Sequence, residues 1–183
     1  MCGFVCLVKR ECNDKKFISE DLLNHRGPDF TNEVNFKSVS IRHWRLSIVD
    51  LSENSNQPIV NEDYIFAYNG EIYNYQDVSK KYFNKIFKSD TNLFFQLLIS
   101  GQIQKIRNCS GFFSYLLLNK SKMIISGGRD ILGKKPLYYF IDADYAIFAS
   151  EESAIVKLLN SSLKINKKSL ISYLYFKSIF FGN

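Results

Sequence analysis

The sequence predicts an α+β fold in which antiparallel sheets pack together. Short runs with the alternation and composition of β-strands dominate the chain. Helical patterns are fewer, and they do not alternate with the strands as βαβ units would. The chain of 183 residues shows no internal repeat and no low-complexity linker, and its length suits one domain with a sizeable core.

The expected strands are apolar or alternating runs that end at turn residues. The first, Cys2–Val8, is short and mostly apolar, and Val34–Val49 mixes β-branched residues with alternating polar ones. A third strand, Tyr64–Tyr68, is expected to stop at the turn pair Asn69-Gly70. Further strands are expected at Phe112–Leu118, Met123–Ser126, Pro136–Ile141 and Tyr145–Ala149.

Helical periodicity is confined to a few segments. Helices are expected at Thr91–Ser100, Glu152–Leu159 and Ser169–Phe176. Either Ser89 or Asp90 would cap the first of them. We expect one domain over residues 1–155 and a helical, apolar tail over residues 156–183. Because so apolar a segment seldom faces water, we expect the tail to dock on its own domain, on a partner or on a continuation of the chain.

Composition and charge exclude several classes of protein. Hydrophobic residues make up 46% of the chain and charged residues 23%, which argues against wholesale disorder. The net charge of +6 comes mostly from scattered lysines, so we expect no nucleic-acid partner. No apolar run is long enough to cross a bilayer, and we expect no membrane association.

The cysteines indicate a reducing compartment and no metal site. We expect a cytoplasmic protein in which Cys2, Cys6, Cys12 and Cys109 remain thiols. Their spacing matches no pair of metal ligands, with or without the two histidines.

Cys2 is the most informative residue of the chain. We expect Met1 to be removed because the next residue is small, which leaves a thiol and a free α-amino group on one residue. Thiols and α-amines both titrate near neutral pH, so the amine can accept the proton of the thiol and later protonate a leaving group. A buried strand cysteine without chemistry is the alternative.

Five stretches, in a fixed order, carry the functional argument. They are the Met1-Cys2 start, HRGPD at 25–29, RLSIVDL at 45–51, NGEIYN at 69–74, and SDT at 89–91 together with RDILGKKPLYY at 129–139. Together they resemble the glutaminase domain of glutamine-dependent asparagine synthetases, which are class II glutamine amidotransferases of the N-terminal-nucleophile hydrolase superfamily. The resemblance extends from Cys2 to about Phe181 and identifies residues 1–155 as a glutaminase domain.

The resemblance implies a fold, a reaction and a cofactor requirement. The fold would be a four-layer αββα sandwich with two antiparallel sheets in the middle. Cys2 would attack the side-chain amide of L-glutamine and form a thioester with release of ammonia, and water would then release glutamate. No cofactor is expected in this chain, since ATP and Mg²⁺ would belong to an absent synthetase domain.

The resemblance also implies roles for individual residues. Arg45 would bind the α-carboxylate of glutamine, and Asp90 would bind its α-ammonium group, with Glu71 beside it. The Asn69 side chain and the Gly70 N–H would form the oxyanion hole. The expected catalytic residues are therefore Cys2, Asn69 and Gly70, and the expected glutamine-binding residues are Arg45, Leu46, Ser47, Ile48, Val49, Asn69, Gly70, Glu71 and Asp90.

Structural explanations of these residues remain open at this point. Taken alone, Asn69-Gly70 is a common hairpin turn, Arg45 could pair with Asp50 or Glu53, and Asp90 could be only a helix cap.

Five motif residues are expected to support the fold instead of the chemistry. Arg26 and Asp29 would orient the loop of the nucleophile, and His25 would be a hydrogen-bonded fold residue. Arg129 and Asp130 would brace a sheet as an ion pair.

The sequence thus predicts a glutamine-hydrolysing module that supplies ammonia to an asparagine-synthetase-type reaction. Its expected partners are L-glutamine and an ATP-dependent synthetase domain or a separate acceptor subunit, and a homodimer is left open. One alternative is an amidotransferase module for another acceptor, such as a surface-sugar or secondary-metabolite precursor. Another is a non-catalytic module that binds glutamine or a partner.

Overall fold

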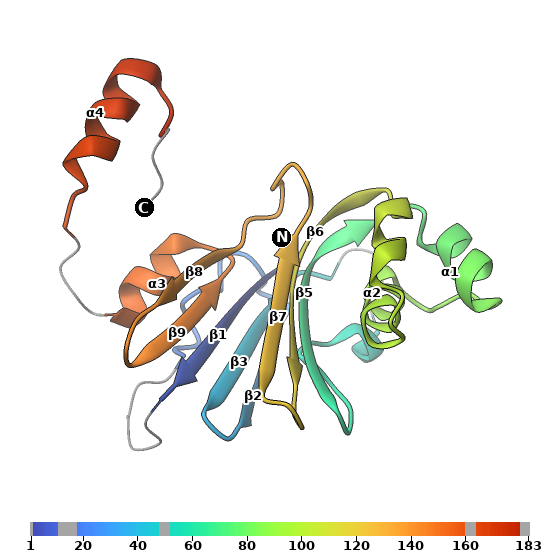
Figure 1. The fold of residues 1–183 in the computed structure, drawn as a ribbon. Coiled ribbons are helices and arrows are strands. Elements are labelled where there is room, and N and C mark those ends of the chain that lie inside the picture. The colour runs from blue at the N-terminus through green and yellow to red at the C-terminus, as the bar shows by residue number, and fades with distance from the viewer. Residues whose placement is uncertain (1, 11–17, 48–51, 160–163, 180–183) are drawn as a thin grey trace.

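Two antiparallel sheets packed face to face form the centre of the molecule (Figure 1). The structure is a computed structural model, which describes residues 2–10, 18–47, 52–159 and 164–179. The first sheet has the strand order β2-β3-β1-β9-β8 and the second has the order β4-β5-β6-β7. Because every pair of neighbouring strands is antiparallel, the predicted α+β class with antiparallel sheets is confirmed.

The strands of the first sheet are β1 (Gly3–Lys9), β2 (Phe30–Phe36), β3 (Val39–Arg45), β8 (Tyr138–Ile141) and β9 (Tyr145–Ala149). Those of the second are β4 (Ile59–Val60), β5 (Tyr64–Ile72), β6 (Gly111–Asn119) and β7 (Ile124–Arg129). The α-helices are α1 (Tyr75–Phe83), α2 (Asp90–Ile99), α3 (Glu152–Leu159) and α4 (Lys167–Phe176), and two short 3-10 helices lie at Glu53–Ser55 and Ile103–Asn108.

The apolar start of the chain is explained by burial of β1 on both faces. Phe4 and Cys6 face the second sheet and pack in the core between the sheets. Val5 and Leu7 face the other way and pack under α3. A strand covered on both faces carries a continuous apolar run instead of an alternating one.

Helices cover the outer faces of the two sheets (Figure 1). The buried side of α3, formed by Ala154, Ile155 and Leu158, packs on the first sheet. The aromatic side of α2, formed by Phe94 and Phe95, packs on the second sheet. Helix, sheet, sheet and helix therefore follow one another as four layers, as in the fold that the resemblance implies.

The predicted end of β5 at the Asn69-Gly70 pair is wrong. The strand continues to Ile72, because β6 pairs with β5 residue by residue from Tyr64 to Ile72. A long partner strand outweighs the local turn preference of an Asn-Gly pair. Similarly, the region Val34–Val49 contains parts of two strands, β2 and β3, which are joined at Lys37 with a positive φ of 52°.

The two C-terminal helices, α3 and α4, differ in how they contact the sandwich. The expected division at residue 155 falls inside α3, whose Leu158 is buried against the first sheet. Helix α4 stands away from the sandwich, and only Ser172 of its residues is buried (Figure 1). Docking of this segment on a partner or a continuation of the chain stays a prediction.

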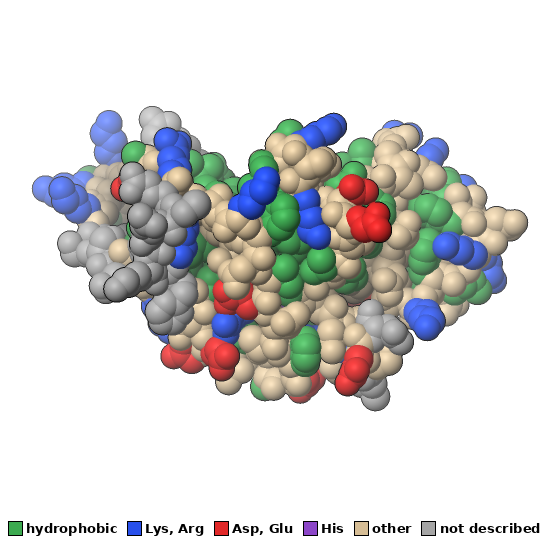
Figure 2. Space-filling model, turned by 90° about the horizontal axis from the view of Figure 1, so that it is seen from below, with side chains coloured by type: hydrophobic (Ala, Val, Ile, Leu, Met, Phe, Trp, Pro, Cys, Tyr) green, Lys and Arg blue, Asp and Glu red, His purple; other side chains and the backbone are tan. Residues whose placement is uncertain are grey.

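The surface is mixed in charge on the end of the molecule seen in Figure 2. Basic side chains are scattered there between acidic, hydrophobic and neutral ones, and no continuous basic stripe is visible among the described residues. No described helix is long and apolar enough to span a membrane.

His43 links the two sheets through a buried hydrogen bond. This residue of β3 is fully buried, and its Nε2–H donates to the Tyr68 carbonyl of β5 over 3.0 Å. Its Nδ1 has no hydrogen-bond partner among the described residues. Burial lowers the pKa of His43 to about 4, and the positive charge of Arg45 adds to this, although the bond to Tyr68 opposes the shift.

We expect His43 to make the protein sensitive to acid. Since the folded pKa lies below the ordinary value of 6.5, the unfolded chain binds this proton first as the pH falls. The stabilising effect of the neutral side chain is complete above about pH 6.5 and is lost as the pH falls towards 4. Urea unfolding at pH 7.5 and 4.5 should give the His43→Gln variant an acid-induced loss of unfolding free energy smaller by about 2–3 kcal/mol than that of the wild type. Equal losses would contradict this.

Candidate active site

The residue that precedes β1, Cys2, lines a pocket between the two sheets. Most of the residues predicted to act on glutamine line it together with several that the sequence did not single out. The lining residues are Cys2, Arg45, Leu46, Ser55, Gln57, Tyr68, Asn69, Gly70, Glu71, Ser89, Asp90, Thr91 and Lys135. Ser47 is described but does not line the pocket, and the predicted residues Ile48 and Val49 lie outside the described residues.

Cys2 is half-buried, and its thiol contacts the backbone that follows β3. The Leu46 N–H donates to Cys2 Sγ over 3.3 Å, and Cys2 Sγ lies 3.5 Å from the Leu46 carbonyl oxygen. Both contacts come from one residue, so the thiol is held beside the segment that carries Arg45. The next N–H, that of Ser47, donates to Asp29 Oδ2 over 2.7 Å and fixes this segment in turn.

Arg45 is a buried cation at the wall of the pocket. Its Nη1 donates to the Ser52 carbonyl over 2.8 Å and to Asn56 Oδ1 over 2.6 Å. These two acceptors help to orient the guanidinium group. The side chain lines the pocket and is a planar cation of the kind that binds carboxylates.

The free edge of β5 presents a backbone N–H to the pocket. Tyr68 N–H donates to Gln57 Oε1 over 2.7 Å, and Ile72 N–H donates to Asp90 Oδ2 over 3.0 Å. Gly70 lies between them and faces the same edge, because its partner Phe113 directs its own N–H and C=O to Asp130 on the other side. The Gly70 N–H therefore points to the pocket between two neighbours that are already bonded.

The side chain of Asn69 adds a second donor on the same strand. Asn69 is almost completely buried, and its Nδ2 has no hydrogen-bond partner among the described residues. Leaving a buried donor without an acceptor costs about 1–3 kcal/mol, so this amide favours an acceptor atom that enters the pocket. Together with Gly70 N–H, it has the composition of an oxyanion hole.

Asp90 supplies negative charge on the opposite side of the pocket. Its Oδ2 accepts hydrogen bonds from Ile72 N–H and, over 3.3 Å, from the hydroxyl of Tyr68. Burial raises the pKa of Asp90 above its ordinary value, its hydrogen bonds oppose the rise, and the negative charge of Glu71 adds to it. Among the described residues no cation pairs with this carboxylate, which therefore attracts a positively charged ligand.

The helix cap at this position is Ser89. Its Oγ accepts the N–H of Asn92 over 3.2 Å, whereas Asp90 begins the helix itself. Ser89 thus leaves the carboxylate of Asp90 available for β5 and for the pocket.

The expected ion pair between Arg129 and Asp130 is not observed among the described salt bridges. Instead, Asp130 accepts backbone N–H groups of the loop that follows it, those of Leu132, Lys134 and Lys135, and that of Phe113. Burial raises the pKa of Asp130, but these hydrogen bonds outweigh it and leave the pKa below its ordinary value. The carboxylate thus shapes the loop that brings Lys135 to the pocket.

Sequence reasoning missed several residues of the pocket wall. Gln57 holds the backbone of Tyr68 and Tyr68 bonds Asp90, whereas Asn56 orients Arg45 from outside the pocket lining. Ser89, Thr91 and Lys135 lay in motifs that drew attention, but Gln57, Tyr68 and Asn56 gave no local signal of a role in the site. The loop residues Arg26 and Asp29 were expected to orient the nucleophile, and they contact Cys2 and Ser47.

Comparisons with known proteins place the chain among glutamine amidotransferase domains. A family model described as a glutamine amidotransferase domain matches residues 1–181. Asparagine synthetase [glutamine-hydrolyzing] 1 of Bacillus subtilis is 32% identical over 98% of the chain, and putative asparagine synthetase [glutamine-hydrolyzing] 2 of Methanocaldococcus jannaschii is 33% identical over 94%. The chain spans only 30% and 39% of the length of these two relatives.

A solved structure shares the fold. Glutamine phosphoribosylpyrophosphate amidotransferase of B. subtilis, complexed with ADP and GMP, superposes with a TM-score of 0.70 at 19% sequence identity. The match covers 88% of this chain and 44% of that one. At this identity the likeness establishes the fold alone.

We expect Gly70 to tolerate no side chain. A Cβ atom at this position would lie 2.6 Å from the Phe112 carbonyl oxygen and 2.7 Å from the Tyr68 ring, and the backbone oxygen cannot move without disturbing β6. Gly70→Ala should lower the free energy of unfolding by about 2–3 kcal/mol in urea titrations. Gly101→Ala is the comparison, because Gly101 has open space and only a positive φ of 72°, so its cost should be about 1 kcal/mol. A smaller loss for Gly70→Ala than for Gly101→Ala would contradict the crowding.

Proposed function

The chain belongs to the glutamine amidotransferase domain family, and we propose that it hydrolyses L-glutamine to glutamate and ammonia with Cys2 as nucleophile. The observation that carries the proposal is the set of charged and polar groups gathered around the thiol. A buried carboxylate without a cation, a buried amide donor without an acceptor and a buried guanidinium group line one pocket. These groups complement the charges of a free amino acid with a side-chain carbonyl.

Arg45 and Asp90 would bind the main-chain charges of glutamine. The α-carboxylate would pair with Arg45 on the side of the first sheet, and the α-ammonium group with Asp90 on the side of the second. The side chain of the substrate would then extend towards Cys2. Fixing both charged groups of the substrate brings the amide carbon within reach of the thiol, which lowers the entropic part of the barrier.

The chemical steps follow from the groups around the amide. The sulfur of Cys2 would bond to the amide carbon, and its proton would pass to the α-amino group of the same residue. The negative charge on the former amide oxygen would be stabilised by Gly70 N–H and Asn69 Nδ2–H. The α-ammonium group would protonate the departing nitrogen, which leaves as ammonia, and water would then cleave the thioester to glutamate.

The ammonia would be consumed by a second active site. Because this chain spans only 30% and 39% of the length of the two relatives named asparagine synthetase, we propose that an ATP-dependent synthetase domain or subunit uses the ammonia that this pocket releases. The half-reaction itself would need no metal or cofactor, and ATP and Mg²⁺ would bind to the synthetase part. The reaction would take place in the cytoplasm, where the thiol of Cys2 stays reduced.

Replacing the proposed nucleophile should abolish the reaction. We expect Cys2→Ala to reduce glutamate release from glutamine by at least about 10³-fold, because no other group can form the thioester. Cys109→Ala is the matched control, since Cys109 packs beside α2 and does not line the pocket, and it should keep activity within about twofold. Full activity in Cys2→Ala, or in a preparation that retains Met1, would refute the assignment.

Removing the charge of Asp90 should weaken substrate binding more than chemistry. In Asp90→Asn an oxygen remains to accept the Ile72 N–H, but the attraction for an α-ammonium group is lost. We expect KM for glutamine to rise about 10–100-fold while kcat changes by less than about fivefold. Asp77→Asn on the exposed side of α1 is the control for the change in net charge. An unchanged KM in Asp90→Asn would show that this carboxylate does not bind the substrate.

A further inference from the structure

The start of β1 extends beyond the end of its neighbour β9 and has no partner strand on that side. On the side of β9, backbone pairing begins at Val5 with Ala149. Phe4 and Cys2 lie before this point, and alternation directs their backbone groups to the same side as β9. A different set of groups must therefore hold the start of β1, where the nucleophile is attached.

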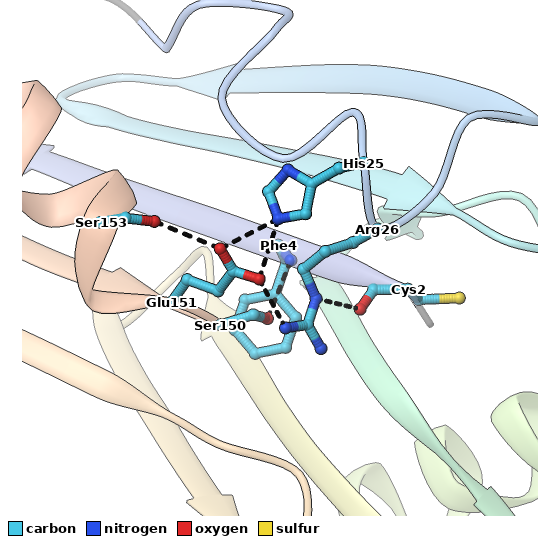
Figure 3. A network of polar contacts seen from close by, with 7 residues as sticks. All are labelled: Cys2, Phe4, His25, Arg26, Ser150, Glu151 and Ser153. Carbon is cyan, nitrogen blue, oxygen red and sulfur yellow. Dashed lines mark hydrogen bonds and ion pairs between the residues drawn. The ribbon is translucent and has the colours of Figure 1, made fainter.

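Ser150, the residue after β9, holds Phe4 through two hydrogen bonds. Phe4 N–H donates to Ser150 Oγ, and Ser150 N–H donates to the Phe4 carbonyl, each over 3.0 Å (Figure 3). Both residues are completely buried. Cys2 lies two residues before Phe4. Its carbonyl accepts a hydrogen bond from Arg26 Nε over 3.0 Å, in the position where a longer β9 would donate one.

Glu151 determines where the guanidinium group of Arg26 lies. Arg26 Nη1 donates to Glu151 Oε1 over 2.8 Å, at the other end of the guanidinium group from Cys2 (Figure 3). The side chain of Arg26 also lies flat on Gly3, where a Cβ atom would be only 3.1 Å from Arg26 Cδ. The arginine is thus fixed at three points: by Glu151, by Gly3 and by the Cys2 carbonyl.

The carboxylate of Glu151 lies outside the pocket, but it is mostly buried and its hydrogen bonds lower its pKa. Glu151 does not line the pocket, and 26% of its side chain is exposed. Burial raises the pKa of Glu151, but hydrogen bonds from Arg26 and His25 outweigh it and hold the pKa below its ordinary value. His25 Nε2 lies 3.0 Å from the carboxylate but donates nothing to Cys2, so Arg26 is the connection to the nucleophile.

We propose that Glu151 is a positioning residue for the proposed glutamine hydrolysis, acting on Cys2 through Arg26. Once Met1 is removed, as the proposed function requires, the orientation of Cys2 depends on the bonds made by its own carbonyl and by the residues that follow. Without Glu151, the guanidinium group of Arg26 can rotate and the Cys2 carbonyl can follow it. A displacement of the thiol by about 1 Å from its productive position is enough to cost about 10²-fold in rate.

A double-mutant cycle tests this connection. We expect Glu151→Ala and Arg26→Ala each to lower kcat for glutamine hydrolysis by about 10–100-fold, with KM changed by less than about threefold because Arg45 and Asp90 remain in place. The double variant should be no slower than Arg26→Ala alone, since the two residues act in series. Glu152→Ala is the matched control, because Glu152 is the exposed neighbour with the same charge, and its kcat should stay within about twofold.

Conservative variants and a measurement without substrate separate positioning from folding and from the proposed function. Glu151→Gln keeps an oxygen for Arg26 and should recover about threefold of the lost kcat, so that its rate lies between those of Glu151→Ala and the wild type. In the absence of glutamine, the backbone amide of Phe4 should exchange with deuterium at least about tenfold faster in Glu151→Gln and Glu151→Ala than in Glu152→Ala, with the largest effect in Glu151→Ala.

Each outcome decides the proposal. Additive losses in the double variant, a kcat of Glu151→Ala within threefold of the wild type, or unchanged exchange at Phe4 would overturn it. If Glu151→Ala does not fold, Glu151→Gln must still show the intermediate loss of kcat and the faster exchange, and wild-type values would overturn it equally. Activity in Cys2→Ala would refute the proposed function, whereas the exchange result would still show whether Glu151 fixes the chain start.

Discussion

Pairing of β1 on both sides is the constraint on which the active site depends. β3 pairs with it from Gly3 onward and β9 from Val5 onward, so the first residue after the proposed nucleophile is already part of a sheet. The side chains from Phe4 to Leu7 are completely buried, alternately between the sheets and under α3. Each such side chain contributes about 1.5–3 kcal/mol, which is enough to hold a chain terminus that would otherwise fray.

The opening beside the nucleophile exists because β4 is short. β4 pairs with β5 only at Ile65 and Phe66, and the remaining edge of β5 is left without a strand. Gln57 and Asp90 satisfy two of the exposed N–H groups, and Gly70 is left to face the pocket. A longer β4 would bond Gly70 N–H and close the pocket. An incomplete sheet edge, ordinarily a risk for aggregation, thus becomes part of the pocket wall.

The parts of the fold that could be predicted are those that local pattern determines. β9 and α3 have the predicted bounds, because alternation and helical periodicity are strong there and turns flank both segments. Helix α1 was missed, since Tyr75–Phe83 is mostly polar and buries only Val78 and Ser79. β5 was predicted too short because its length is set by β6, which is distant in sequence.

The same division applies to the site. Cys2, Arg45, Gly70 and Asp90 could be proposed because they lie in short motifs whose order resembles a known family, and all four line the pocket. Gln57 and Glu151 could not, because each acts through a side-chain contact with a residue far away in the chain. Asp130 was given the wrong partner for a related reason: which donors surround a carboxylate depends on the path of the following loop.

The distance between the proposed nucleophile and the proposed oxyanion donors is a distance between two sheets. Cys2 and Arg45 belong to the first sheet and its following segment, whereas Asn69 and Gly70 lie on β5 of the second. The core between the sheets and the buried bond from His43 to Tyr68 fix this separation. Protein cores are packed as densely as organic crystals, so the separation is set before any substrate arrives. Donors held in place in this way need no reorganisation when charge develops on the substrate, and the packing of the sandwich thereby contributes directly to the proposed chemistry.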